Sequence, residues 1–139
     1  MKRKIIITGG AKGLGLEISK IALNRGYEVG IIDNDKTAVK LAKEQNEGIR
    51  GYVANVTKEE EVKEALDRLG TPNVLVNNAG IVRFGPLIEQ SVEDFISTVN
   101  INLIGTYIGT SAPQPTINVL NCSFNWSFIW NFNGFPFRC

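Results

Sequence analysis

The chain has 139 residues, 43% apolar and 21% charged, and its 15 basic and 14 acidic side chains leave a net charge of +1. These values predict a globular domain and argue against a nucleic-acid or membrane partner held by bulk charge. Without histidine, and with only two cysteines, the sequence excludes histidine catalysis and a four-thiolate zinc site, so we expect no metal. No apolar run of membrane-spanning length and no signal-type start occur, which favours a cytoplasmic protein.

The charge is unevenly distributed along the chain. Residues 1–111 hold 14 of the 15 basic side chains and all 14 acidic ones. The segment 112–139 carries one charge, Arg138, with both tryptophans and five of the seven phenylalanines. We therefore expect a folded domain over 1–111 and an atypical, low-charge aromatic tail over 112–139, which could be irregular.

Apolar periodicity in residues 1–111 predicts strands alternating with helices. The expected strands are 4–8, 28–32, 51–53 and 73–76, and the expected helices are 14–25, 37–45, one from Thr57 to about Leu69, and 91–111. Short connections between them predict right-handed crossovers and helices on both faces of a parallel sheet. The fold class is thus α/β, the N-terminal half of a doubly wound, Rossmann-type sheet with strand order 3-2-1-4.

The same periodicity predicts the buried face and the start of each helix. Thr57 and Glu60 have the spacing of a capping box, and Ser91 with Asp94 marks the start of the last helix. The residues expected to face the core are Leu14, Ile18, Ile21 and Ala22; Val39, Leu41 and Ala42; Val62, Ala65, Leu66 and Leu69; and Phe95, Val99 and Leu103.

A glycine-rich turn links the first strand to the first helix, which is the context that a dinucleotide loop requires. Gly9 lets the chain turn off the strand, and Gly13 lets a pyrophosphate approach the backbone. Gly15 allows the helix to lie close to the sheet. The amides at the helix start would attract the phosphates, although glycines alone also fit a turn that binds nothing.

Asp33 ends the second strand and supplies an independent indication of a dinucleotide site. A carboxylate there can accept both ribose hydroxyls of adenosine and repel a 2′-phosphate, which favours NAD over NADP. Lys12 instead favours NADP, because a basic side chain beside the phosphate loop can bind a 2′-phosphate. Alone, Asp33 could equally be a helix cap or a solvated loop acid.

With these residues in place, four segments in order resemble the short-chain dehydrogenase/reductase family. They are Thr8-Gly9-x-x-x-Gly13-x-Gly15, Asn55-Val56, Asn77-Asn78-Ala79-Gly80 and Asn102-Leu103-Ile104-Gly105. The resemblance implies an NAD(P)-dependent oxidoreductase interconverting an alcohol and a ketone, with Asn102 as a catalytic residue. The cofactor contacts implied are Gly9, Lys12, Gly13, Leu14, Gly15, Asp33, Asn55, Val56, Asn78, Ala79 and Gly80.

The resemblance also implies a small-molecule substrate and possible homo-oligomers formed through the 91–111 helix. Other interpretations of the asparagines stay open. Asn77 and Asn78 could merely tie strand ends together, and Asn100 and Asn102 could be ordinary amides on a helix surface.

The family pattern continues with a strand ending in Ser and a helix carrying Tyr-x-x-x-Lys. In that pattern the Tyr gives or takes the hydroxyl proton, and the Lys lowers the pKa of the Tyr. None of the three tyrosines, Tyr27, Tyr52 and Tyr107, has a lysine four residues later, and no Tyr or Lys follows residue 111. We expect the chain to be inactive. The alternatives are a non-catalytic dinucleotide-binding module and a truncated product without function.

The tail itself allows several interpretations. Thr116–Ser123 faintly resembles a fifth strand ending in Ser123, and the alternating aromatics from Trp126 to Phe132 fit one face of a strand. Those aromatics could bind a partner or a membrane surface, or have no evolved role. The abrupt loss of charge suggests the hypothesis of a shifted reading frame or gene-model error, which the other two frames beyond codon 111 would test.

Overall fold

The computed structural model describes residues 2–84, 86–112 and 118–121. The predictions for Ser123, for the alternating aromatics and for both cysteines lie outside these residues.

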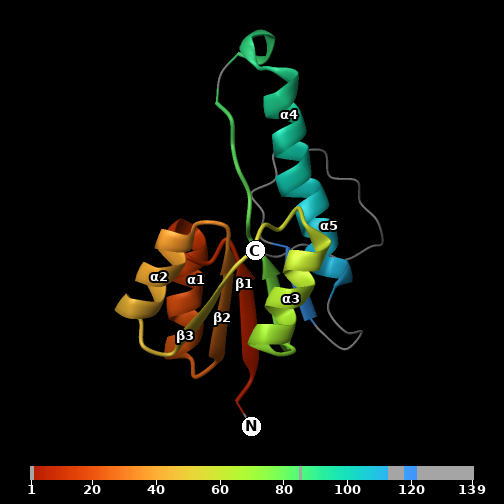
Figure 1. Ribbon diagram of the computed structural model, residues 1–139. Helices are drawn as coiled ribbons and strands as arrows, with labels where there is room; N and C mark the ends of the chain where they lie inside the picture. Colours follow the sequence, from red (N-terminus) through yellow and green to blue (C-terminus); the bar gives the residue numbers. More distant parts are fainter. Residues whose placement is uncertain (1, 85, 113–117, 122–139) are drawn as a thin grey trace.

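The chain forms a parallel sheet between helices, which confirms the predicted fold class (Figure 1). The strands are β1 (Lys4–Thr8), β2 (Glu28–Asp33), β3 (Ile49–Val53), β4 (Val74–Asn77) and β5 (Asn118–Asn121). The helices are α1 (Gly13–Asn24), α2 (Lys36–Gln45), α3 (Glu59–Leu69), α4 (Val92–Val99) and α5 (Gly105–Ser111). A short 3-10 turn, η1 (Leu87–Glu89), precedes α4, and a π-helical segment, η2 (Asn100–Ile104), joins α4 to α5. The strand order is β3-β2-β1-β4-β5.

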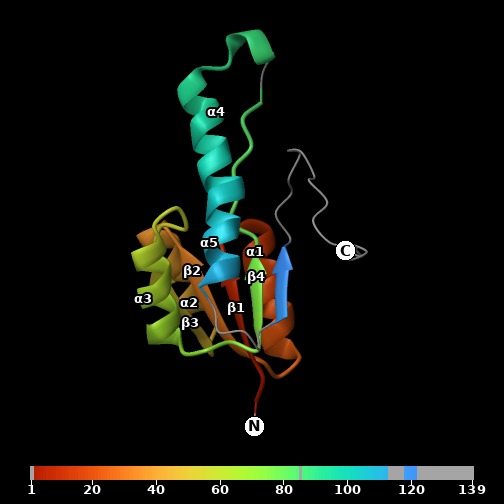
Figure 2. The ribbon, with the colours of Figure 1, turned by 90° about the vertical axis from the view of Figure 1, so that its right-hand side faces the viewer.

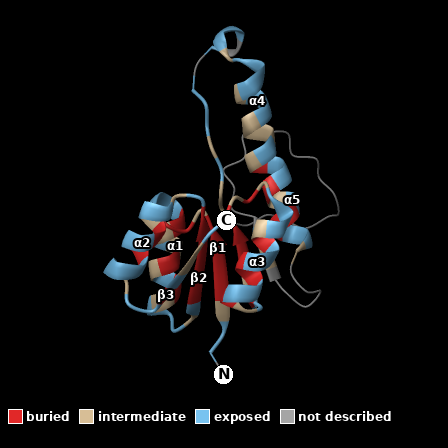
Figure 3. Ribbon diagram, viewed as in Figure 1, coloured by how far each residue is buried: buried red, intermediate tan, exposed pale blue. Residues whose placement is uncertain are grey.

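The alternation of side chains along β1 divides the core into two layers. Ile5 and Ile7 pack with residues of α1 and α2, whereas Ile6 packs on the opposite face with residues of α3 and α5. Both faces of the central strands are therefore buried, as Figure 3 shows in red. Such double burial explains why these strands are continuous apolar runs rather than alternating ones.

Strand β5 extends the predicted four-stranded sheet. It pairs in parallel with β4, from Val74 opposite Asn118 to Asn77 opposite Asn121 (Figure 2). The strand lies inside the Thr116–Ser123 segment that resembles a fifth strand, so the structure favours that interpretation over an irregular segment at 118–121. Pairing covers the edge that β4 would otherwise expose.

The predicted buried face is confirmed for α3, where all four residues are buried, but it is partly wrong for the first two helices. Leu14, Ile21 and Leu41 have exposed fractions of 55%, 52% and 46%. The prediction is confirmed for Ala22, which is buried, and Ile18 is partly buried against the same core. Helix α1 also contacts the sheet through Gly15 and Ser19, which follow the predicted Leu14 and Ile18 by one position, or about 100° around the helix. Small side chains allow the closer approach.

The predicted helix over 91–111 is divided into α4, η2 and α5. Its start is confirmed, because the Ser91 hydroxyl accepts a hydrogen bond from the Asp94 amide at 3.0 Å. The expectation that Phe95 and Leu103 face the core is wrong, since both are exposed. Helix α4 projects beyond the sheet in both views, so its apolar residues have no strand beneath them (Figures 1 and 2).

The predicted capping box at Thr57 is also wrong. Helix α3 begins two residues later, at Glu59, with Lys58 as its N-cap. The Thr57 hydroxyl donates to Asn55 Oδ1 at 2.8 Å, and the same oxygen accepts the Thr57 amide. This local turn competes with the cap for the Thr57 side chain, which is the usual behaviour of Asn and Thr pairs near helix starts.

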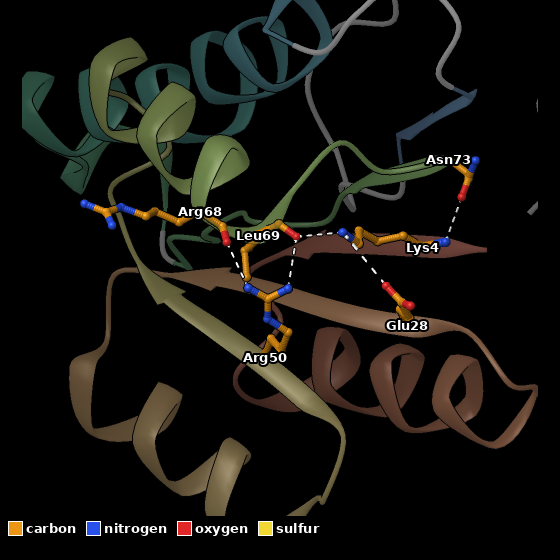
Figure 4. Close-up of polar contacts among 6 residues, drawn as sticks. All are labelled: Lys4, Glu28, Arg50, Arg68, Leu69 and Asn73. Carbon is orange, nitrogen blue, oxygen red and sulfur yellow. Dashed lines mark hydrogen bonds and ion pairs between the residues drawn. The ribbon is translucent and has the colours of Figure 1, made fainter. Parts of the chain in front are cut away.

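At the other end of α3, two cations from the sheet bind the last carbonyl groups (Figure 4). Lys4 Nζ donates to the carbonyl of Leu69 at 2.9 Å, and the Arg50 guanidinium donates to the carbonyls of Arg68 and Leu69. A helix C-terminus carries partial negative charge, so both contacts are favourable. They fix α3 to β1 and β3 at the amino ends of the strands, away from the site described next.

Candidate functional site

A cleft of about 640 Å³ opens at the carboxyl ends of the strands. The turns after β1, β2, β3 and β4 contribute to its walls, together with residues of α4 and η2. All of the predicted cofactor contacts except Gly13 line it: Gly9, Lys12, Leu14, Gly15, Asp33, Asn55, Val56, Asn78, Ala79 and Gly80. Segments far apart in the sequence are thus brought to one edge of the sheet, as expected for a doubly wound fold.

The turn after β1 depends on its glycines for two different reasons. Gly9 and Gly13 have φ values of 62° and 54°, a left-handed conformation that disfavours other residues. Gly15 instead lies against the carbonyl of Gly9 and the side-chain amide of Asn78, leaving no room for a Cβ atom. The predicted close approach of α1 to the sheet at Gly15 is therefore observed.

The start of α1 has the features of an anion site. Its N-cap residue is Lys12, whose ammonium donates to Asp35 and has no acceptor to offer the first amides of the helix. A Cβ atom built at Gly13 would have no described atom within 4 Å, so space lies in front of the backbone there. Backbone amides and the positive end of the helix dipole thus lie beside an open region, an arrangement that favours an anion such as a phosphate.

Asp33 lies at the bottom of the cleft with an exposed fraction of 6%. Its Oδ2 accepts the Ala11 amide at 3.2 Å and its Oδ1 accepts the Asp35 amide at 3.1 Å. The interpretations as a helix cap or a solvated loop acid are both wrong, because Asp35 caps α2 and Asp33 is buried. An ionised carboxylate offers about four acceptor positions, so two backbone bonds leave capacity for hydroxyl donors.

Lys12 and Asp35 form an ion pair at the rim of the cleft, with 3.0 Å between Nζ and Oδ2. Asp35 Oδ1 meanwhile accepts the Ala38 amide at 2.9 Å and caps α2. The Ala38 amide and then the Lys12 ammonium lower the pKa of the Asp35 carboxyl. Its hydrogen bond and charge in turn raise the pKa of Lys12, so both groups stay ionised around neutral pH.

Asn78 ties the end of β4 to the end of β1. Its side-chain amide donates to the carbonyls of Thr8 and Gly9, at 3.0 and 3.2 Å. In return, the buried Thr8 hydroxyl accepts the amides of Asn78 and Ala79. The tying role left open for Asn78 is therefore observed, and it holds the glycine turn in place beside the cleft.

Asn77 makes a different connection, from the sheet to α5. Its side-chain amide is 3.1 Å from the Thr110 hydroxyl and 3.4 Å from the Thr106 carbonyl, and the residue is buried. Gly109 leaves space for this amide, because a Cβ atom there would overlap Asn77.

Asn102 is buried in the π-helical segment η2, so the interpretation as a surface amide is wrong for this residue. Its Oδ1 accepts the Ile81 amide at 2.8 Å, and its Nδ2 donates to the Ile81 carbonyl at 2.9 Å. The side chain thereby fixes the backbone that follows Gly80 in the cleft wall. Asn100, in contrast, is exposed and lines the cleft.

Sequence reasoning missed the contribution of α4 and η2 to the cleft, made by Ser97, Asn100 and Ile101. No local motif marks these residues, since they reach the cleft only because the helix projects past the sheet. Within the described ranges, no group of three acidic or cysteine side chains could hold a metal ion. Nor does this part of the chain contain a helix long and apolar enough to cross a membrane.

Comparison with known proteins decides the family. The family model described as short chain dehydrogenase matches residues 3–118. The chain belongs to the short chain dehydrogenase family. Membership confirms the resemblance drawn from the four sequence segments, and it makes the chain a relative of NAD(P)-dependent oxidoreductases.

The relatives that this chain matches are named for different substrates. The chain is 36% identical over 118 residues to 2-dehydro-3-deoxy-D-gluconate 5-dehydrogenase of Formosa agariphila, covering 78% of the chain and 45% of the relative. It is 39% identical over 109 residues to 3-beta-hydroxysteroid dehydrogenase of Comamonas testosteroni, covering 75% and 43%. The chain spans about half the length of the curated relatives it matches.

A solved relative shows the same architecture. The crystal structure of 3-ketoacyl-(acyl-carrier-protein) reductase from Brucella melitensis, complexed with NADH, matches with a TM-score of 0.71 and 29% identity. The match covers 78% of this chain and 47% of that one.

Proposed function

We propose that this chain binds a nicotinamide dinucleotide in the cleft at the carboxyl ends of β1 to β4. The observation that carries the proposal is the buried Asp33 carboxylate, held by two backbone amides across the cleft floor from the open start of α1. A carboxylate acceptor for ribose and free helix amides for phosphate are the two requirements for holding such a cofactor. The NADH-bound reductase of Brucella melitensis, which shares this fold, supports the assignment.

Each predicted residue has a place in this proposal. Asp33 would accept the adenosine ribose hydroxyls, the turn from Gly9 to Gly15 would hold the pyrophosphate, and Asn55-Val56 would flank the adenine. Asn78, Ala79 and Gly80 would line the path of the second ribose. Residues 1–111 would hold all of these cofactor contacts, and β5 at 118–121 would extend the same sheet beyond them.

NAD is the expected cofactor rather than NADP. A 2′-phosphate would bring two further negative charges next to the Asp33 carboxylate, which is buried and poorly screened by water. Lys12 is the cation nearest to offset that charge, and it is already paired with Asp35.

The reaction proposed for a site of this kind, once a Tyr and a Lys complete it, is interconversion of an alcohol and a ketone. When bound, the nicotinamide ring supplies or accepts the hydride. The Asn102 side chain would act as a positioning group, holding the cleft wall at Ile81, instead of contacting the reacting atoms. In the family pattern a Tyr moves the hydroxyl proton, and a Tyr with a pKa near 10 needs a neighbouring cation to do so at neutral pH.

We further propose that these 139 residues alone do not catalyse turnover, because they contain no Tyr-x-x-x-Lys sequence. The same absence favours the second candidate, a non-catalytic dinucleotide-binding module. Thermal unfolding with and without NADH tests binding, since a ligand that binds only the folded chain raises the melting temperature. NADH absorbance against a panel of ketones tests turnover. We expect NADH to raise the melting temperature without being consumed. Rapid consumption of NADH would overturn the proposal that the chain is inactive. A chain that never unfolds cooperatively would indicate a product without function.

Self-association through the 91–111 helix is part of the same proposal. Phe95, Leu103 and Tyr107 are exposed by 63%, 59% and 69%, and together they give α4, η2 and α5 a large exposed apolar surface. Sedimentation of the wild-type chain and a Phe95→Ser variant tests it. A dimer that the substitution weakens is expected, and monomers for both would refute it.

A further inference from the structure

The ion pair between Lys12 and Asp35 joins the turn after β1 to the start of α2. Lys12 precedes Gly13 in the turn after β1, and Asp35 is the N-cap of α2. The Lys12 ammonium bonds Asp35 Oδ2 at 3.0 Å, while Oδ1 of the same carboxylate caps the helix at Ala38. The Asp35 carboxylate thus caps α2 with one oxygen and binds the exposed Lys12 ammonium with the other.

Lys12 brings a cation near Asp33, the residue proposed to accept the adenosine ribose hydroxyls. Its side chain lines the cleft together with Asp33 and Asn34, and the negative charge of Asp33 acts on its ammonium. Asp33 itself uses both oxygens to fix the backbone on either side of this position, at Ala11 and Asp35. Among the described side chains, Lys12 is the only cation lining the cleft.

We infer that Asp35 is a specificity-determining residue, which disfavours NADP(H) by holding the Lys12 ammonium away from the 2′ position of a bound dinucleotide. The inference rests on the proposed dinucleotide binding. Its physical content is a competition for the charge of one cation: while Lys12 is paired with Asp35, its ammonium is held toward that carboxylate and is partly neutralised by it. Two acidic side chains, Asp33 and Asp35, lie near the single ammonium of Lys12, so a 2′-phosphate gains little net attraction there.

The substitution Asp35→Asn separates the two contacts of Asp35, the cap of α2 and the ion pair with Lys12. Its side-chain oxygen can still accept the Ala38 amide, and Asn is among the best N-cap residues, so α2 remains capped. The charge that holds Lys12 is lost. The matched control is Glu44→Gln, which removes one carboxylate from the same helix and breaks the exposed Lys40–Glu44 pair of 3.8 Å at the opposite end.

The test is calorimetric titration of the wild-type chain, Asp35→Asn, Lys12→Gln and the double variant with NADH and with NADPH. Asp35→Asn should bind NADPH about fivefold more tightly than wild type, the upper end for an exposed ion pair, with NADH affinity changed less than about twofold. The gain should shrink at high salt, because the interaction is screened. In the Lys12→Gln background it should largely disappear, and Glu44→Gln should match wild type with both cofactors.

The outcomes are distinguishable. A gain that requires Lys12 supports the inference. With NADH binding intact, an unchanged NADPH affinity in Asp35→Asn overturns it, and so does an equal gain with and without Lys12, because direct repulsion by Asp35 would then suffice. If the wild-type chain, folded by circular dichroism, binds neither cofactor, the proposed dinucleotide binding fails and the inference fails with it.

Discussion

Asn102 holds the backbone of Ile81 through two hydrogen bonds, 2.8 and 2.9 Å long, between residues 21 apart in the sequence. One side chain satisfies both the amide and the carbonyl of Ile81, in the wall of the cleft that follows Asn78-Ala79-Gly80. Because Asn102 lies in a π-helical segment, the departure from α-helix and the position of this side chain coincide. Single π-helical turns of this kind often occur at functional sites.

Replacing Asn102 should therefore loosen the cleft. Asn102→Leu removes the partners of the part-buried amide and carbonyl of Ile81, and we expect a loss of about 1–3 kcal/mol in the free energy of unfolding. Urea unfolding measures it. Asn100→Leu, at an exposed position in the same segment, is the control and should cost much less. Equal losses for the two variants would contradict the role given to Asn102.

The two glycines of the turn should respond differently to alanine. At Gly15 the added methyl group would meet the Gly9 carbonyl and the Asn78 amide, so Gly15→Ala should shift α1 and greatly weaken NADH binding. At Gly13 the methyl group meets only open space, and the left-handed backbone sets a cost of about 1 kcal/mol in stability. Thermal unfolding and NADH titration compare them, and a milder effect at Gly15 than at Gly13 would be inconsistent with the packing described.

Asp33→Asn should weaken NADH binding by about tenfold or more, because hydrogen bonds to a charged acceptor contribute about 1.5–3 kcal/mol. It should also narrow the preference for NADH over NADPH, since the buried negative charge is removed. Asp67→Asn, on the exposed face of α3, is the matched control. Unchanged affinity in Asp33→Asn would remove the main support for the site.

Arg50 should contribute to stability at the end of the sheet remote from the cleft. Arg50→Met keeps an apolar stem but loses the hydrogen bonds to the carbonyls of Arg68 and Leu69 at the end of α3. We expect a loss of about 1–2 kcal/mol without a change in NADH affinity. Arg25→Met, at an exposed position, serves as the control. A change in affinity at unchanged stability would show that the two ends of the sheet are coupled.

Acid should remove the stabilisation that the Asp35 charge provides. The Ala38 amide and the Lys12 ammonium lower the pKa of Asp35 in the folded chain, so the ionised form favours folding. This contribution is complete above about pH 4, the value for an unfolded Asp, and is lost as the pH falls through the lower folded value. The melting temperature of wild type should exceed that of Asp35→Asn near neutrality, and the gap should close in acid. A gap that widened in acid would contradict the sign of the shift.

The alternating strands and helices could be predicted because doubly buried strands and amphipathic helices leave strong periodic patterns, as in Ile5 to Ile7 and Val62 to Leu69. The inward face of α1 could be predicted only in part, at Gly15 and Ala22. Ser19 also contacts the sheet, and the small size that suits it to this position matters only once the sheet is present. Likewise, nothing local in the sequence shows that Phe95 lies beyond the sheet edge, where no core can cover it.

The candidate site was predictable where a motif follows a strand end, as with the glycine turn, Asp33 and Asn78. These residues meet because parallel strands bring their carboxyl ends to one edge. The contacts that these residues make with other parts of the chain join positions far apart in the sequence, and no local sequence pattern marks them. The Lys12–Asp35 pair and the binding of Asn102 to Ile81 depend on how two turns pack together, and only the structure reveals them.

Titration calorimetry of the 139-residue chain with NADH tests the central claim most directly. We predict saturable binding of one NADH per chain, weaker binding of NADPH, and a marked loss of NADH affinity in Asp33→Asn. A folded chain that releases no heat with millimolar NADH, or that binds NADH equally well without the Asp33 carboxylate, would contradict the claim.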